Sequence, residues 1–262
     1  MLFRSTKRPT WSAKRWGSSP ACSDLSTGTG TSLARSRCRS YHGVMQLRRM
    51  CTAVSVVISA TAALMIPVPT AGADPCPDVE VVFARGRIEP AGTGQVGEAF
   101  VNALRAKTDK SVSFYAVDYP ADIEVIQGAN DMSRHIQSMA ANCPDTRLVL
   151  GGYSLGAAVT DVVVAVPAPI FGYTSPLPLG MDDHIAAVAL FGNGTRKILG
   201  PVSDISPLYG EKTIDLCTND DPVCNNNLDP NTWADNWPAH QYAAYVESGL
   251  VDQAAAFVAA RL

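Results

Sequence analysis

The sequence predicts an α/β fold: a three-layer α/β/α sandwich in which helices cover both faces of a mostly parallel, five-stranded central sheet. Two observations predict it. Short runs of β-branched and other apolar residues alternate with segments whose apolar residues recur at helical spacing. In addition, one short buried strand, Arg147 to Gly151, leads through a glycine-rich turn directly into a helix-like run.

The strands and helices are assigned in chain order from composition and spacing. The first strand is Val79-Glu80-Val81-Val82-Phe83-Ala84, and the others are expected at 113–117, 147–150, 185–191 and 213–216. Helices are expected at 96–104, 131–141 and 157–163. A closing helix over 241–262 would place Val246, Leu250, Ala254 and Phe257 on one face, which indicates packing against the sheet.

Two loops are distinctive in composition. Residues 167–180 contain four prolines, and residues 225–238 contain Trp233 and Trp237. In an open parallel sheet, ligands bind beyond the carboxyl ends of the strands, where both loops can lie. Residues 168–173 and the two tryptophans could therefore form an apolar lip for an acyl chain and touch a lipid surface transiently, or simply pack at the edge of the fold.

The first 73 residues do not resemble a folded domain. Residues 1–44 hold eight basic residues and one acidic residue, so we expect a disordered leader or an over-long start with Met45 as the true initiator. Residues 45–73 have the parts of a signal peptide: a basic segment, a mostly apolar run of fourteen at 53–66, and a small-residue cleavage site near Ala73. A membrane anchor is the rival interpretation, but a spanning helix needs about 20 apolar residues, and Pro67 and Pro69 interrupt this run.

Cleavage would leave a single acidic domain at 74–262, secreted to the extracellular space or the cell wall. The leader carries ten basic residues and one acidic residue, so 11 basic and 23 acidic residues remain, a net charge of −12. Such a domain is not suited to nucleic acid, whose binding depends on contacts from Lys and Arg to phosphate. We expect a monomer.

Four of the seven cysteines lie in this domain: Cys76, Cys143, Cys217 and Cys224. An even number fits a disulfide framework in an exported protein, with three possible pairings. The short spacing of Cys217 and Cys224 suggests a local ring, which leaves Cys76 with Cys143. A zinc site is the rival interpretation, but the sequence has neither a C-x-x-C pair nor a histidine cluster. We therefore expect no metal.

Gly152-Tyr153-Ser154-Leu155-Gly156 matches G-x-S-x-G, the pattern of a sharp strand-to-helix turn that exposes a nucleophilic serine. The flanking glycines let the backbone bend tightly. An ordinary glycine-rich turn is the alternative, but the strand-like sequence before the motif and the helix-like sequence after it favour the exposed serine. Ser154 is the candidate nucleophile of a serine hydrolase.

A serine nucleophile needs a histidine base and an acid, in the chain order Ser, Asp or Glu, His for this kind of fold. His42 is in the leader, His135 precedes Ser154, and His184 has no suitable loop acid before it, so His240 remains. Asp220 and Asp221 directly follow the fifth strand, inside the suggested cysteine ring. Spacing alone does not choose between these two acids.

The chain from Cys76 to nearly its end resembles the cutinase family of α/β-hydrolases, and most of all the cutinase-like exported proteins of mycobacteria and their relatives. The matching features are Cys76, Phe83-Ala84-Arg85-Gly86, Cys143, the G-x-S-x-G pentapeptide, Cys217-Thr218-Asn219-Asp220-Asp221-Pro222-Val223-Cys224 and His240. The resemblance implies Asp221 as the acid and His240 as the base. It also implies the pairings Cys76 with Cys143 and Cys217 with Cys224.

The same resemblance implies an oxyanion hole made by the backbone N–H groups of Leu155 and Arg87, and two residues depart from the family there. Leu155 stands where the family usually has Gln, and Arg87 where a Ser or Thr hydroxyl commonly adds a third donor. Losing one oxyanion donor can cost roughly 10²- to 10³-fold in rate. We therefore expect an active but slow esterase.

The resulting hypothesis is a secreted serine carboxylesterase that needs no cofactor and acts on short- to medium-chain fatty acyl or lipid esters. Two alternatives stay open. One is a catalytically weak or silent surface or binding protein that keeps the fold. The other is a lipase, phospholipase or acyltransferase relative.

Overall fold

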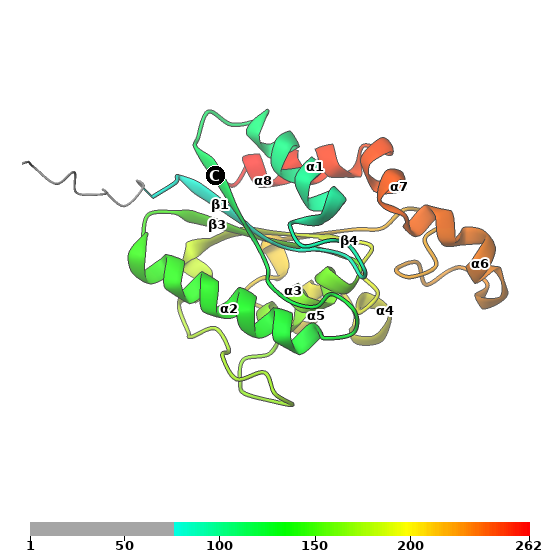
Figure 1. Ribbon diagram of the computed structural model, residues 1–262, viewed down its shortest axis with the longest axis horizontal. Helices are drawn as coiled ribbons and strands as arrows, with labels where there is room; N and C mark the ends of the chain where they lie inside the picture. Colours follow the sequence, from blue (N-terminus) through cyan, green and yellow to red (C-terminus); the bar gives the residue numbers. More distant parts are fainter. Residues whose placement is uncertain (1–75) are drawn as a thin grey trace, which may run out of the picture. The chain divides into compact units, whose positions relative to one another are not determined.

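The computed structural model describes residues 76–262, which fold around a single sheet of five parallel strands (Figure 1). The strand order is β2-β1-β3-β4-β5. The strands are β1 Val79–Ala84, β2 Val112–Ala116, β3 Arg147–Tyr153, β4 Ile185–Phe191 and β5 Thr213–Leu216. The predicted fold class is confirmed. The predicted leader and signal peptide lie outside the described residues.

Helices cover both faces of the sheet (Figure 1). One layer contains α1 (Gly94–Arg105), α7 (Tyr242–Glu247) and α8 (Leu250–Ala259), and the other contains α2 (Val125–Asn142), α3 (Leu155–Ala165) and the short α5 (Val202–Ile205). The shorter elements are α4 (Arg196–Leu199), α6 (Trp233–Asn236) and 3-10 turns at Met181–His184, Gly210–Lys212, Pro230–Thr232 and Trp237–His240. No helix of residues 76–262 combines the length and apolar character needed to cross a membrane.

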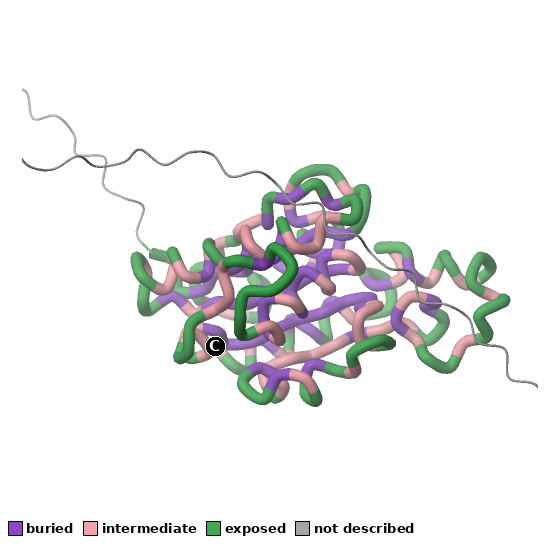
Figure 2. The backbone as a smooth tube through the Cα atoms, turned by 90° about the horizontal axis from the view of Figure 1, so that it is seen from below, coloured by how far each residue is buried: buried purple, intermediate pink, exposed green. Residues whose placement is uncertain are grey.

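The alternation of side chains along β1 divides the core in two. Val79, Val81 and Phe83 face the layer of α1 and α8, whereas Val82 and Ala84 face the layer of α2 and α3. This period of two is the geometry of a strand. Because both faces are covered, β1, β3 and β4 are almost entirely buried, and exposed positions are found mainly on the surrounding loops and outer helix faces (Figure 2).

Two expected helices differ from the observed ones. The prediction of one closing helix over 241–262 is wrong, because Gly249 adopts φ 80° and separates α7 from α8. A left-handed residue ends a helix, and glycine adopts that conformation without steric cost. As a result Val246 is exposed, while Ala254 packs in the core. Helix α2 begins at Val125, six residues before the expected start.

The carboxyl ends of β1, β3, β4 and β5 lie at one edge of the sheet, because the strands are parallel. The loops that follow these strands therefore meet there. The proline-rich loop 167–180 instead runs along α2, where Asn130 Nδ2 donates to the Gly172 carbonyl (2.8 Å) and the Thr174 N–H donates to Asn130 Oδ1 (2.8 Å).

Candidate active site

Ser154 occupies the turn between β3 and α3 in a backbone conformation that L-residues rarely adopt, with φ 54° and ψ −114°. Close packing requires glycine at position 152, before the serine. A β-carbon on Gly152 would lie 2.1 Å from the Gly156 carbonyl oxygen. The turn can therefore form only with glycine at position 152, and it leaves the Ser154 side chain half-buried at the edge of the sheet. Strain of this kind is concentrated at functional sites.

The structure brings Ser154, His240 and Asp221 into one hydrogen-bonded chain. Ser154 Oγ lies 2.8 Å from His240 Nε2, and His240 Nδ1 lies 2.7 Å from Asp221 Oδ2. His240 and Asp221 are buried, whereas the neighbouring Asp220 is exposed. A proton on Nδ1 donates to the Asp221 carboxylate and leaves Nε2 free to accept the serine hydroxyl proton.

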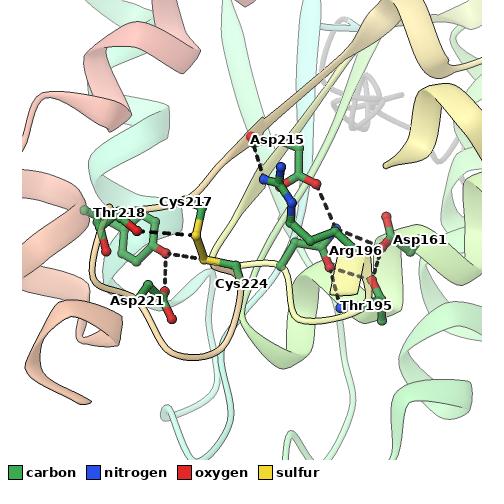
Figure 3. A network of polar contacts seen from close by, with 10 residues as sticks. Asp161, Thr195, Arg196, Asp215, Cys217, Thr218, Asp221 and Cys224 are labelled. Atoms are coloured by element: carbon green, nitrogen blue, oxygen red, sulfur yellow. Dashed lines mark hydrogen bonds and ion pairs between the residues drawn. A yellow bond between two sulfur atoms is a disulfide. The ribbon is translucent and has the colours of Figure 1, made fainter. Parts of the chain in front are cut away.

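The loop that carries Asp221 is closed by the disulfide Cys217–Cys224 (Figure 3). Within this ring, the Asp221 N–H donates to the Thr218 carbonyl (3.2 Å), and Asp221 Oδ1 accepts from the Val223 N–H (2.7 Å). Thr218 Oγ1 also donates to the carbonyl of Ala239, beside His240 (2.8 Å). The ring thus fixes the carboxylate and ties it to the histidine loop.

The second disulfide, Cys76–Cys143, joins the segment before β1 to the end of α2. It closes a much longer loop, with a sequence separation of 67 against 7 for the Cys217–Cys224 ring.

His240 is held from several sides. The Tyr153 hydroxyl donates to the His240 carbonyl oxygen, and the Trp237 ring lies 5.0 Å from the imidazole between centroids. Gly192, at φ 60°, makes room for the ring, because a β-carbon there would lie 3.0 Å from His240 Cε1. These contacts leave the imidazole little freedom to turn away from Ser154.

The two backbone N–H groups assigned to the oxyanion hole, those of Arg87 and Leu155, take part in none of the hydrogen bonds found within residues 76–262. Leu155 directs its side chain against the core of the α2 and α3 layer. The Arg87 side chain is exposed and enters none of the ion pairs of the described chain. Neither N–H group is therefore occupied by a hydrogen-bond partner from the described part of the chain.

The loop that carries Arg87 is fixed by Glu89, which the sequence analysis did not identify. Glu89 Oε2 accepts from the Gly86 N–H (2.5 Å), and Glu89 Oε1 accepts from the Gln95 N–H (2.9 Å). Buried Arg85 completes the clamp by donating to the Glu89 carbonyl (2.9 Å). In the sequence, the signal that pointed to Glu89 is its position two residues after Arg87. Only the fold shows which N–H groups the Glu89 carboxylate reaches.

A cleft of about 310 Å³ opens over Ser154. Its lining residues are Arg87, Ile88, Glu89, Gln95, Tyr153, Ser154, Val223, Trp237, His240, Gln241 and Tyr242. Of the residues expected to form an apolar lip, Trp237 lines the cleft, and Trp233 stacks on it with ring centroids 5.9 Å apart. Residues 168–173 are not part of the lining.

A buried acidic network lies next to the Asp221 loop (Figure 3). Asn193 Nδ2 bridges Asp161 Oδ2 (2.9 Å) and Asp215 Oδ2 (3.2 Å), and Arg196 Nη1 lies 3.4 Å from Asp215 Oδ1. Burial raises the pKa of the Asp161 carboxyl. Burial, aided by the nearby charge of Asp161, raises the pKa of Asp215 to about 6 despite Arg196. The network therefore holds a proton in mildly acidic solution.

One group of potential metal ligands occurs in the described part of the chain, formed by Cys217, Asp221 and Cys224. Both sulfurs are joined in a disulfide and offer no thiolate. The Asp221 carboxylate already accepts hydrogen bonds from Val223, His240 and Tyr245. This chemistry does not suit a metal ion.

Comparisons with known proteins identify the family of the chain. The family model described as Cutinase matches residues 75–262. Probable carboxylesterase Culp2 of Mycobacterium tuberculosis is 65% identical over 187 residues, which cover 71% of this chain and 80% of that protein. Phospholipase Culp4 of Mycobacterium tuberculosis is 50% identical over 220 residues, 82% of this chain and 92% of that protein.

Among solved structures, Trichoderma reesei cutinase in complex with a C11Y4 phosphonate inhibitor is 31% identical, with a TM-score of 0.54 over 71% of this chain and 76% of that chain. The chain belongs to the cutinase family of ester hydrolases.

Proposed function

We propose that the protein is a secreted serine carboxylesterase in which Ser154 is the nucleophile, His240 the general base and Asp221 the acid that orients it. The observation that carries the proposal is the unbroken chain of contacts, 2.8 Å from Ser154 Oγ to His240 Nε2 and 2.7 Å from His240 Nδ1 to Asp221 Oδ2. A base must reach the proton that it removes, and these distances meet that condition.

The reaction would proceed in two steps. Ser154 Oγ attacks the ester carbonyl carbon while its proton passes to His240 Nε2, and the imidazolium then protonates the departing alcohol. Water next attacks the acyl-enzyme, giving one proton to His240, which returns it to Ser154 Oγ as the carboxylic acid leaves. The N–H groups of Leu155 and Arg87 would stabilise the oxyanion in both steps.

The substrates we propose are short- to medium-chain fatty acyl or other lipid esters. The cleft of about 310 Å³ has Ile88, Val223 and Trp237 among its walls, which suits a modest apolar acyl group. The exposed apolar side chains around it, Ile88 and Trp233 among them, suit a transient contact with a lipid surface.

Covalent labelling tests the nucleophile without a choice of substrate. A fluorophosphonate probe is expected to label the wild type on the peptide containing Ser154 and to leave Ser154→Ala unlabelled. Hydrolysis of p-nitrophenyl esters from acetate to decanoate then reports the acyl-chain preference. Hydrolysis that persists in Ser154→Ala would overturn the assignment, and a wild type that neither reacts with the probe nor hydrolyses esters would support the silent surface protein instead.

A phospholipase is the second candidate, because the relative named Phospholipase Culp4 is 50% identical to this chain. Release of fatty acid from dispersed phosphatidylcholine, measured beside the p-nitrophenyl series, separates the two activities. Added glycerol would reveal an acyltransferase if acylglycerol formed in preference to free acid.

We also propose that residues 45–73 act as a signal peptide that directs export and is cleaved near Ala73. Amino-terminal sequencing of the protein recovered from the culture medium or cell wall tests it. A mature chain that begins close to Asp74 is the expected result, whereas retention of the apolar run would indicate an anchor.

A further inference from the structure

Tyr245 is buried beside the acid and was not singled out by any motif. It lies on α7, five residues after His240, and its side chain is fully buried. Its hydroxyl donates a hydrogen bond to Asp221 Oδ2, the same oxygen that accepts from His240 Nδ1. The reaction outlined above assigns no task to this phenol.

The donors around Asp221 divide between its two carboxylate oxygens. Oδ1 accepts from the Val223 N–H at 2.7 Å, whereas Oδ2 accepts from both His240 and Tyr245. The three donors come from three segments, so the carboxylate is fixed in position as well as in rotation. Hydrogen bonds to an ionised acceptor are stronger than neutral ones, so this arrangement favours the carboxylate.

The phenol stays protonated here and can therefore donate. Burial, followed by the charge of Asp221, raises the pKa of Tyr245 well above the ordinary value for tyrosine. The ring is held by edge contacts with Tyr153 and Phe191, at centroid distances of 5.6 and 6.3 Å. The hydroxyl also lies 3.4 Å from Cys224 Sγ, so the disulfide ring limits its movement.

We propose that Tyr245 is a positioning residue for ester hydrolysis, which holds Asp221 Oδ2 against His240 and withdraws part of the charge that this oxygen would otherwise offer to the imidazolium. The inference rests on the proposed function of Ser154, Asp221 and His240. With less charge on Oδ2, the imidazolium is less favoured, and the neutral imidazole that can act as a base persists to lower pH. Among the other titratable groups, Tyr153 of β3 acts on Tyr245, and Glu89 of the loop after β1 acts on Tyr153.

Tyr245→Phe removes the hydroxyl and keeps the ring. The rate of fluorophosphonate labelling of Ser154, measured from pH 5 to 9, is expected to show an acidic limb whose midpoint lies roughly half a pH unit or more above that of the wild type, as the loss of one hydrogen bond to a charged group can produce. Labelling at pH 6 should fall several-fold, and labelling at the alkaline plateau should change less. A rate lowered equally at every pH, with an unmoved midpoint, would overturn the proposal.

Tyr173→Phe is the matched control. Tyr173 is equally buried, but its hydroxyl bonds to Ser133 on the far side of the sheet (3.3 Å). Tyr173→Phe is expected to lower thermal stability about as much as Tyr245→Phe does, without moving the midpoint of the acidic limb. An equal shift in both variants would attribute the effect to general loosening and overturn the proposal. Labelling that maps away from Ser154 would instead contradict the proposed function itself.

If Tyr245→Phe does not fold, a comparison that keeps the Tyr245 hydroxyl tests the contact. With ¹³Cζ-tyrosine incorporated, the Tyr245 resonance is expected to shift in Asp221→Asn, which keeps the shape of the side chain and removes its charge, while the Tyr173 resonance stays in place. A Tyr245 resonance unchanged by Asp221→Asn would contradict the contact on which the proposal depends.

Discussion

Gly156 lies so close to Ala84 that a β-carbon on Gly156 would be 1.9 Å from the Ala84 carbonyl oxygen. The first turn of α3 is thereby pressed against the end of β1, where the loop carrying Arg87 begins. The second glycine of the pentapeptide thus sets the separation between the serine turn and the other half of the proposed oxyanion hole, in addition to permitting the bend.

Gly156→Ala is therefore expected to destabilise the fold by several kcal/mol, because the clash is with backbone that can move only if β1 and α3 separate. Thermal unfolding and fluorophosphonate labelling measure the effect. Gly194→Ala is the matched control, since the nearest atom there is a Val223 methyl at 3.0 Å that can give way. Equal stability of the two variants would contradict this account.

Two adjacent acids offer a direct test of the proposed triad. Asp221→Asn should lower kcat by roughly 10⁴-fold, because the amide favours the wrong imidazole tautomer. Asp220→Asn, in the same ring but exposed, should leave kcat within about twofold of the wild type. Steady-state hydrolysis of p-nitrophenyl butyrate separates the two, and a larger loss in Asp220→Asn would reverse the assignment.

Arg87→Thr is expected to raise kcat by about tenfold or more, up to the range that one oxyanion donor is worth. The backbone N–H is kept, and the threonine hydroxyl supplies the third donor that the sequence analysis found missing. Arg134→Thr, an exposed arginine on α2, controls for the loss of charge. An unchanged kcat in Arg87→Thr would mean that the hydroxyl does not reach the oxyanion.

Removal of each disulfide should affect stability and activity differently. Loss of the Cys76–Cys143 bridge removes a constraint on a long loop and is expected to cost about 4 kcal/mol of unfolding free energy, against about 2 for the ring of Cys217 and Cys224. The activity of the folded protein should show the opposite order, since only the ring carries Asp221. Urea unfolding and kcat of the two double Cys→Ser variants test the pair, and parallel losses would refute the distinction.

The acidic network should make stability depend on pH. The folded pKa of Asp215, about 6, lies above its unfolded value of 3.8. The protonated side chain therefore contributes stability to the fold that is fully present below pH 4 and is lost as the pH rises through 6. The loss is on the order of 3 kcal/mol. Asp215→Asn should therefore raise the melting temperature at pH 7.5 much more than at pH 4.5, and exposed Asp235→Asn should change neither. A uniform effect of Asp215→Asn would contradict the shifted pKa.

The strands were the most predictable part of the fold. The bounds of β1, β4 and β5 match the expected ranges. For β4 the reason is that a parallel strand buried on both faces consists of an uninterrupted apolar run, whereas β1 and the edge strand β5 were recognised from their β-branched residues despite Glu80 and Asp215. The break at Gly249 was missed because glycine inside a helical pattern is often tolerated, and only the packing of α8 shows that the chain turns there.

Chain order and the family resemblance were enough to bring Ser154, Asp221 and His240 forward as candidates. Glu89 and Tyr245 could not be found in that way. Their importance depends on which N–H group or carboxylate oxygen the fold brings within reach, and neither spacing nor composition encodes that distance.

The bridging amide of Asn193 has a practical consequence for producing the protein. Asn193-Gly194-Thr195 has the form of an N-glycosylation acceptor, yet the Asn193 side chain is fully buried between Asp161 and Asp215. A sugar attached to Asn193 before folding would occupy the space of the buried acidic network and prevent the chain from folding. Expression hosts that glycosylate secreted chains are therefore expected to yield a folded fraction that is entirely unmodified at this site, and Asn193→Gln would not be a harmless way to remove the acceptor.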